Sequence, residues 1–411
     1  MAGLAVLGAA GAVLFAWSGL YSVAASEGHW FVIDRFLRFG MTNSVETHAP
    51  DVTPPKLDDA DLVRLGAAHY YAGCAYCHGA PGTPITPVAQ HMLPVPPDLT
   101  GHVALWTDQE LFWLVKHGLK YTGMPGWPVQ DRDDEVWAMV AFLRQMPGMD
   151  KETYRDLALA EVEAEPQGGE EIARGSAPDA VSACARCHGD EAGPPQSRLV
   201  PRLHGQPREM MENALRAYVD GQRSSGIMQT AASGLSHDEI ADLADYYAGL
   251  EPSARDADAA TASASGHGRE LAESGDPARR IPACMSCHSA SALPVYPRLA
   301  GQNARYIANR LKAWQAGQND RTDTAAIMMP IARLLNDDDI AAVAAYFSSL
   351  SATAGRAPWT SLLPQALKPA GWPSFRGFCS SARRRSLRSF WWRCSLRSPA
   401  PAAFARCSPI P

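Results

Sequence analysis

Three copies of one cysteine and histidine pattern contain the residues best suited to chemistry in this sequence. Each copy has two cysteines separated by two residues and followed at once by a histidine: Cys74-Ala75-Tyr76-Cys77-His78, Cys184-Ala185-Arg186-Cys187-His188 and Cys284-Met285-Ser286-Cys287-His288. Two thiols at this spacing can each add to one vinyl group of a haem, and the next imidazole is then held under the iron as its proximal ligand. The sequence therefore predicts three covalently bound haem c groups.

Two other kinds of site also use a Cys-x-x-Cys pair. A zinc site needs four ligands in paired clusters, yet each copy here stands alone, roughly a hundred residues from the next. A thioredoxin-like redox pair follows a strand in an α/β pattern, and no such pattern surrounds these sites. The three matched copies favour haem attachment over both.

The elements around the first copy define a haem unit at residues 55–150. A helix predicted over residues 58–73 leads into Cys74, and a capping box at Thr107 starts a second helix. Met124 follows in a Gly-Met-Pro loop just before a last helix from about Asp133, where its thioether can reach the far face of the iron. Met124 is thus the predicted sixth ligand; the other candidates in the unit are His91, Met92, His102 and His117.

The second and third units, residues 168–252 and 264–352, repeat each other. Each has a Pro-Arg-Leu-x-Gly-Gln segment after its histidine, at Pro201 and at Pro297. A methionine then follows the histidine by 40 residues in both units, Met228 after His188 and Met328 after His288. This equal spacing predicts axial ligation, with Met329 open as a rival to Met328. Both units end in a capped helix, after Ser236 and after Asn336.

These motifs are similar to those of known haem proteins. The first unit resembles the class I cytochrome c family through Gly66, Tyr70, its haem motif and Met124. The paired units look like the dihaem cytochrome c-four family of bacterial electron carriers. That resemblance implies that the carbonyls of Pro201 and Pro297 contact the proximal imidazoles. It also implies that the second and third haems face each other across a domain interface.

The N-terminal residues 1–50 are expected to associate with a membrane. Leu4 to Ala25 is a 22-residue stretch without a charged side chain, long enough for a helix to cross a bilayer. The small residues at 22–26 leave a cleaved signal peptide as the alternative. Residues 29–39 mix aromatic side chains with arginines, as segments at a membrane surface do. The fold prediction is therefore all-α, with three tandem cytochrome c domains after an N-terminal transmembrane helix.

Charge is distributed unevenly along the chain. The whole chain has a formal net charge of −6. Residues 356–411 contain ten basic and no acidic side chains, so the rest of the chain has a formal charge of −16. The haem-bearing part should therefore repel nucleic acid and favour basic docking surfaces. The basic tail is either an arm for anionic lipid or an out-of-frame extension without selected structure. Six of the nine cysteines lie in the haem motifs, so no disulfide framework is indicated.

The predicted ligand sets indicate electron transfer. Iron with histidine on one side and methionine on the other has no open position for a substrate. We therefore expect an electron carrier and no enzymatic activity of this chain alone. In the first hypothesis it lies on the periplasmic side of a bacterial inner membrane and serves a respiratory chain. Its partner would be a haem-copper oxidase, a quinol-oxidising complex or another cytochrome. The alternative is the cytochrome subunit of a membrane alcohol or sugar dehydrogenase.

Overall fold

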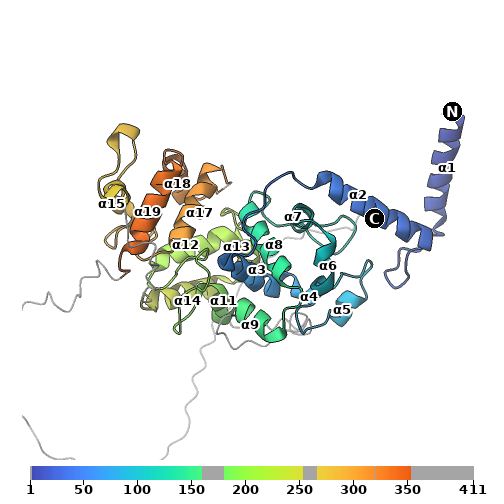
Figure 1. Cartoon of the computed structure of the whole chain (residues 1–411), viewed down its shortest axis with the longest axis horizontal. Helices are drawn as coiled ribbons and strands as arrows, with labels where there is room; N and C mark the ends of the chain where they lie inside the picture. The colour runs from blue at the N-terminus through green and yellow to red at the C-terminus, as the bar shows by residue number, and fades with distance from the viewer. Residues whose placement is uncertain (1, 160–179, 253–265, 319, 353–411) are drawn as a thin grey trace, which may run out of the picture. The chain divides into compact units, whose positions relative to one another are not determined.

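The computed structural model describes residues 2–159, 180–252, 266–318 and 320–352 (Figure 1). In these ranges β structure is limited to three isolated bridges, at Ala80 with Thr83, Asp190 with Gly193, and Asp276 with Ile281. The all-α prediction is confirmed for this part of the chain. Its helices are α1 (Ala2–Ser18), α2 (Phe31–His48), α3 (Ala60–Gly73), α4 (Ala75–His78), α5 (Pro87–Gln90), α6 (Leu99–His102), η1 (Val103–Leu105), α7 (Asp108–His117), α8 (Asp133–Gln145), α9 (Lys151–Leu159), α11 (Ala180–His188), α12 (Arg208–Val219), α13 (Gly226–Ala232), α14 (His237–Gly249), α15 (Gly266–Glu273), η3 (Pro277–Arg279), α16 (Met285–His288), α17 (Ala304–Gln315), α18 (Asp323–Ala332) and α19 (Asp337–Ser349).

The N-terminal apolar stretch differs from its prediction. α1 has 17 residues and ends at Ser18, whose hydroxyl donates to the carbonyl of Phe15 at 2.7 Å. Gly19 then takes a left-handed conformation with φ of 64°, which ends the helix. Among the described helices, none combines the length and the apolar character needed to cross a membrane. α1 therefore ends seven residues before the end of the helix predicted over residues 4–25.

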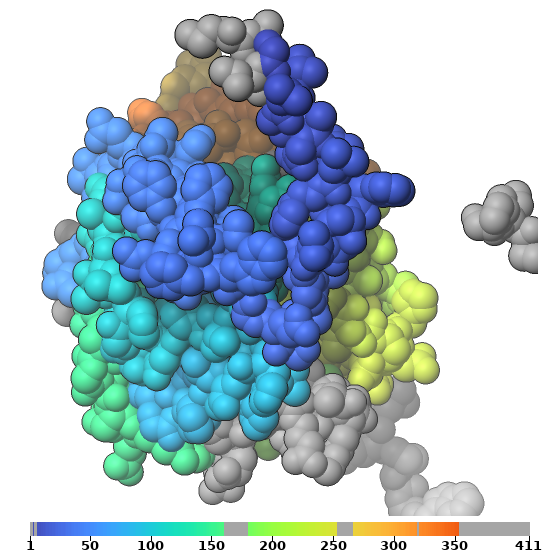
Figure 2. Space-filling view, turned by 90° about the vertical axis from the view of Figure 1, so that its right-hand side faces the viewer, coloured from blue at the N-terminus to red at the C-terminus, as the bar shows by residue number. Residues whose placement is uncertain are grey.

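α2 lies at the surface, as the space-filling view shows in blue (Figure 2). Val45 is its buried residue, whereas the side chains of Phe31, Phe36 and Phe39 are 77%, 69% and 68% exposed. The helix meets α7 through the rings of His48 and Trp113, whose centroids are 6.0 Å apart. The exposed aromatic side chains match the expected composition of an interfacial segment, which stays a prediction.

The first hydrophobic cluster forms where α3 crosses α8. A Cβ atom at Gly66 would lie 2.1 Å from the carbonyl oxygen of Ala138, so only glycine lets the two helices approach this closely. Tyr70 and Phe142 are fully buried beside the crossing. The same device recurs between α15 and α19, where a Cβ atom at Gly268 would lie 2.2 Å from the carbonyl oxygen of Ala342. The first and third units thus each contain a close helix crossing of the same kind.

Three predicted helix starts are confirmed. Capping boxes with reciprocal hydrogen bonds begin α7 at Thr107, α14 at Ser236 and α19 at Asn336. The cap at Ser236 positions α14, which contributes Tyr247 to the second hydrophobic cluster. The cap at Asn336 positions α19, which contributes Phe347 to the third.

The described residues all fall within one compact unit, 1–357. The division into separate domains at 55–150, 168–252 and 264–352 therefore stays a prediction. The basic tail, with Cys379, Cys394 and Cys407, lies outside the described residues, as does most of the two predicted linkers.

Candidate haem-binding sites

Each Cys-x-x-Cys-His motif is wound into a helical turn. In α4 the amide of His78 donates to the carbonyl of Cys74 at 3.0 Å, and in α16 the amide of His288 donates to the carbonyl of Cys284 at the same distance. The second motif, at residues 184–188, forms the end of α11. A helical turn places residues i and i+3 on one face, so each thiol pair faces one side. The six cysteines of the motifs are partly exposed and form no disulfide, as thioether attachment requires.

The second nitrogen of each proximal histidine is held by a proline carbonyl. Nδ1 of His188 lies 3.1 Å from the oxygen of Pro201, and Nδ1 of His288 lies 2.9 Å from the oxygen of Pro297. Both contacts were expected from the family resemblance and are confirmed. A carbonyl can only accept, so Nδ1 bears the proton and Nε2 keeps its lone pair for iron.

His78 has the same contact with a residue that the sequence reasoning missed. Its Nδ1 lies 2.9 Å from the carbonyl oxygen of Pro97. A signal for Pro97 was present, because Pro97-Asp98-Leu99 matches the Pro-x-Leu core of the two repeated segments. The proline-rich loop of the first unit hid this match. All three sites therefore orient the imidazole in one way.

Burial favours the neutral form of the three imidazoles. His188 is 6% exposed and His288 is 8% exposed. Burial lowers the pKa of His188 to about 4, and it also lowers the pKa of His288 and of His78. Ligation by histidine requires the neutral ring, so the environment favours the form that binds iron.

The predicted methionine ligands lie on two kinds of element. Met124 is on a loop, where its amide donates to Oγ1 of Thr122 at 3.1 Å and its carbonyl accepts from Leu119 at 3.2 Å. Met228 and Met328 lie within the helices α13 and α18. A serine cap starts the first of these helices and a threonine cap starts the second.

The rival ligands occupy other places. Met328 packs against the third hydrophobic cluster, which does not include Met329. Nδ1 of His91 and Nδ1 of His102 each lie beside a carbonyl oxygen four residues earlier, at 2.7 and 2.6 Å. Met92 reaches the Met124 loop, because a Cβ atom at Gly123 would lie 2.1 Å from its Cε atom. The ligand assignments of Met124, Met228 and Met328 stay predictions.

The second and third sites are joined through their repeated segments. Gln206 accepts from the amide of Arg298 and donates to its carbonyl, both at 2.9 Å. Gln302 accepts from the amide of Arg202 at 2.9 Å and donates to its carbonyl at 3.1 Å. Each arginine directly follows the proline that holds a proximal histidine. This reciprocal pairing matches the facing arrangement implied by the resemblance.

Each site fits a c-type haem, because a helical thiol pair and a neutral imidazole with an oriented Nε2 stand together. Models of known families match the parts of the chain that contain these sites. A family model described as "Cytochrome C oxidase, cbb3-type, subunit III" matches residues 61–143 and 173–246, and a model described as "Cytochrome c" matches residues 268–351. These three spans contain the three motifs.

Individual relatives cover about half of the chain or less. The thiosulfate dehydrogenase electron acceptor of Thiomonas intermedia strain K12 is 34% identical over 177 residues, covering 42% of this chain and 81% of the relative. Cytochrome c4 of Pseudomonas aeruginosa is 32% identical over 184 residues, covering 44% and 89%. The solved structure of Acidithiobacillus ferrooxidans cytochrome c4 is 35% identical and covers 41% of this chain and 99% of its own, with a TM-score of 0.38. The chain belongs to the class I cytochrome c family and is related to the dihaem cytochromes c4.

Proposed function

We propose that this chain is a three-haem electron carrier of a bacterial respiratory chain that passes electrons to a terminal oxidase. The observation behind this proposal is the threefold recurrence of a helical thiol pair whose histidine is oriented by a proline carbonyl, at Pro97, Pro201 and Pro297. When bound, each haem supplies a one-electron centre. His78, His188 and His288 would each ligate an iron, and Met124, Met228 and Met328 would supply the second axial ligands, which would leave no position for a substrate.

The oxidase proposal has two supports. The family model that matches residues 61–143 and 173–246 is described as an oxidase subunit. The haem-bearing part also has a strong negative charge, which favours association with a basic docking surface at low ionic strength. We place the haem-bearing part on the periplasmic side of the inner membrane.

A second candidate is the role of electron acceptor for a dehydrogenase. Two relatives, 34% and 35% identical, are named as thiosulfate dehydrogenase electron acceptors. In this role the chain would receive electrons from the dehydrogenase, whereas in the first role it would pass electrons to the oxidase. A sulfur-compound dehydrogenase therefore replaces the alcohol or sugar dehydrogenase as the alternative partner.

Rapid mixing of the purified, haem-loaded chain with each partner tests the proposal. The reduced chain should be reoxidised by membranes that contain a haem-copper oxidase, at a rate that falls as salt is added. The oxidised chain mixed with thiosulfate and its dehydrogenase tests the second candidate. Failure of reoxidation by the oxidase contradicts the first role. Turnover of thiosulfate, peroxide or an alcohol without a partner contradicts the assignment as a carrier.

A further inference from the structure

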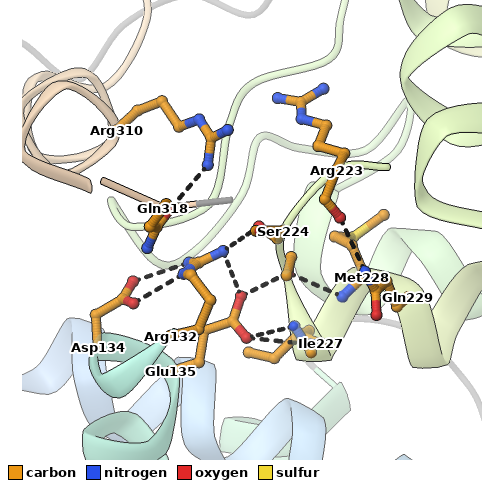
Figure 3. A network of polar contacts seen from close by, with 12 residues as sticks. Arg132, Asp134, Glu135, Arg223, Ser224, Ile227, Met228, Gln229, Arg310 and Gln318 are labelled. Atoms are coloured by element: carbon orange, nitrogen blue, oxygen red, sulfur yellow. Dashed lines mark hydrogen bonds and ion pairs between the residues drawn. The ribbon is translucent and has the colours of Figure 1, made fainter. Parts of the chain in front are cut away.

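Glu135 is a charged residue of the first haem unit that is buried against the second. Three acidic residues begin α8, and this position in a helix favours negative charge. Two of them have the exposure usual for such residues, but Glu135 is only 2% exposed. Its side chain points toward residues 224–228, as the close view shows (Figure 3).

The contacts of Glu135 all come from donors. Oε2 accepts from the amides of Gly226 and Ile227 at 2.7 and 3.3 Å. It also accepts from Nε1 of Trp127 at 3.2 Å. Oε1 accepts from the hydroxyl of Ser225 at 2.5 Å and lies 2.8 Å from Nη1 of Arg132. Because all these partners are donors, they favour the carboxylate anion of Glu135. Burial raises the pKa of Glu135, and the positive charge of Arg132 opposes this effect.

Two successive hydrogen bonds connect Glu135 to Met228, the predicted iron ligand of the second unit. Ser225 is the N-cap of α13 and accepts from the amide of Met228 at 3.1 Å, while its hydroxyl proton points to Glu135. Glu135 also binds the next two amides of the same turn. The carboxylate therefore holds the first turn of α13, and through it the backbone from which the thioether of Met228 extends.

The same carboxylate holds the neighbourhood of the first unit's ligand. Trp127 stands three residues after Met124, and its amide donates to the carbonyl of Lys116 at 2.8 Å. Its ring occupies the space beside Gly226, where a Cβ atom would lie 2.3 Å from Nε1. The methionine loop of the first unit and the methionine helix of the second thus meet at one carboxylate.

Arg132 fixes the carboxylate from the other side. Its Nε and Nη2 atoms donate to the two oxygens of Asp134, both at 2.8 Å. Its Nη1 donates to the carbonyl of Ser224 at 2.8 Å, directly before the N-cap. The guanidinium therefore binds both units and leaves Glu135 one orientation.

We infer that Glu135 is a positioning residue. Through it, the first haem unit holds the backbone of Met228 in the second unit where the methionine sulfur can bind the haem iron. This inference rests on the proposed ligation of three haem irons by methionine. Replacing Glu135 with glutamine turns one acceptor into a donor that faces other donors. We expect the first turn of α13 to shift and the bond between Met228 and iron to weaken.

The test compares full-length, haem-loaded variants by their near-infrared methionine-to-iron band and by the reduction potential of each haem. Met228→Ala defines the share of the band that belongs to the second haem, about a third if the three haems contribute equally. Glu135→Gln should lose most of that share and lower the potential of one haem. Ser225→Ala, which keeps the carboxylate and removes the relay, should lose part of it.

Glu239→Gln is the matched control, because it removes another acidic helix cap of the second unit, in which the carboxylate of Glu239 accepts from the amide and the hydroxyl of Ser236. It should lower the stability and leave the band and the potentials unchanged. An unchanged band and unchanged potentials in folded Glu135→Gln with three haems overturn the inference. If Glu135→Gln does not fold, an unchanged band in Ser225→Ala overturns it. An unchanged band in Met228→Ala also overturns it, since the ligand would be misassigned, whereas failed electron transfer with a normal band contradicts only the proposed function.

Discussion

The hydroxyl of Tyr70 donates a 2.7 Å hydrogen bond to the carbonyl of Gly79, the residue directly after the proximal His78. Tyr247 does the same for Gly189 in the second unit, at 2.9 Å. The first tyrosine comes from α3 and the second from α14, so two different helices supply the same bond. Both glycines have positive φ, at 68° and 72°, and each bond fixes the turn that leaves the haem motif.

Tyr70→Phe should lower the free energy of unfolding by about 1–2 kcal/mol, because the buried carbonyl of Gly79 loses its donor. Denaturant unfolding followed by circular dichroism measures this. Tyr247→Phe should show a loss of the same size. Tyr121→Phe is the control, because its side chain is fully exposed and should change nothing. Equal stability of Tyr70→Phe and Tyr121→Phe would contradict the structural role.

Alanine variants of Met124, Met228 and Met328 should each remove one part of the near-infrared methionine-to-iron band. Loss of the thioether leaves the iron with a weaker sixth ligand and lowers the potential of that haem. Absorption spectra of the oxidised proteins measure the band. Met329→Ala is the matched control for the third unit and should retain the full band. If the band is lost in Met329→Ala and kept in Met328→Ala, the two assignments must be exchanged.

The first unit is also tied to the other two through Asp61, which is 5% exposed. Its carboxylate accepts from the amide and from Nε of Arg198, at 2.8 and 2.9 Å, and also contacts Arg305. Asp61→Ala leaves two arginines without this anion and should lower the free energy of unfolding by about 3 kcal/mol. Denaturant unfolding monitors the effect.

Asp58→Ala provides the comparison for Asp61, because Asp58 pairs with Lys56 at 3.6 Å while both side chains are mostly exposed. Exposed pairs of this kind contribute about 0–1 kcal/mol. A loss in Asp61→Ala no greater than in Asp58→Ala would show that the contacts among the units add little stability.

Asp339 should make the stability of the third unit depend on pH. Hydrogen bonding to Arg279, with further help from the amide of Asn336 and from His267, holds the pKa of Asp339 well below its usual 3.8. A lowered folded pKa means that the stabilisation is complete well above 3.8 and declines as the pH falls below that value. Unfolding measured from about pH 7 to about pH 3 should show this decline.

Asp339→Asn should be less stable than the parent protein at neutral pH, by about 2 kcal/mol, since hydrogen bonds to charged groups are lost. It should also lose part of the acid dependence. Asp337→Asn is the control, because its side chain is 82% exposed in the same helix turn. Parallel pH curves for the parent protein and Asp339→Asn would rule out this role.

The sequence by itself determined the three haem motifs and the helix starts at Thr107, Ser236 and Asn336. These features depend on short spacings or on a repeat, so neighbouring residues specify them. The carbonyl contacts of Pro201 and Pro297 were implied by the family resemblance of the repeated segments. Pro97 was missed only because a proline-rich loop masked the repeated Pro-x-Leu core. The end of α1 also depends on a neighbouring residue, because the left-handed conformation of Gly19 ends the helix before the end of the uncharged stretch.

Only the tertiary structure decided how the units meet. Glu135 had the sequence features of an ordinary helix-start acid, and 90 residues separate it from Ser225. Asp61 likewise sits 137 residues before Arg198. No local pattern distinguishes an acid that faces solvent from one that faces another unit. Packing makes that difference, because removing a carboxylate from water requires donors that distant segments must supply.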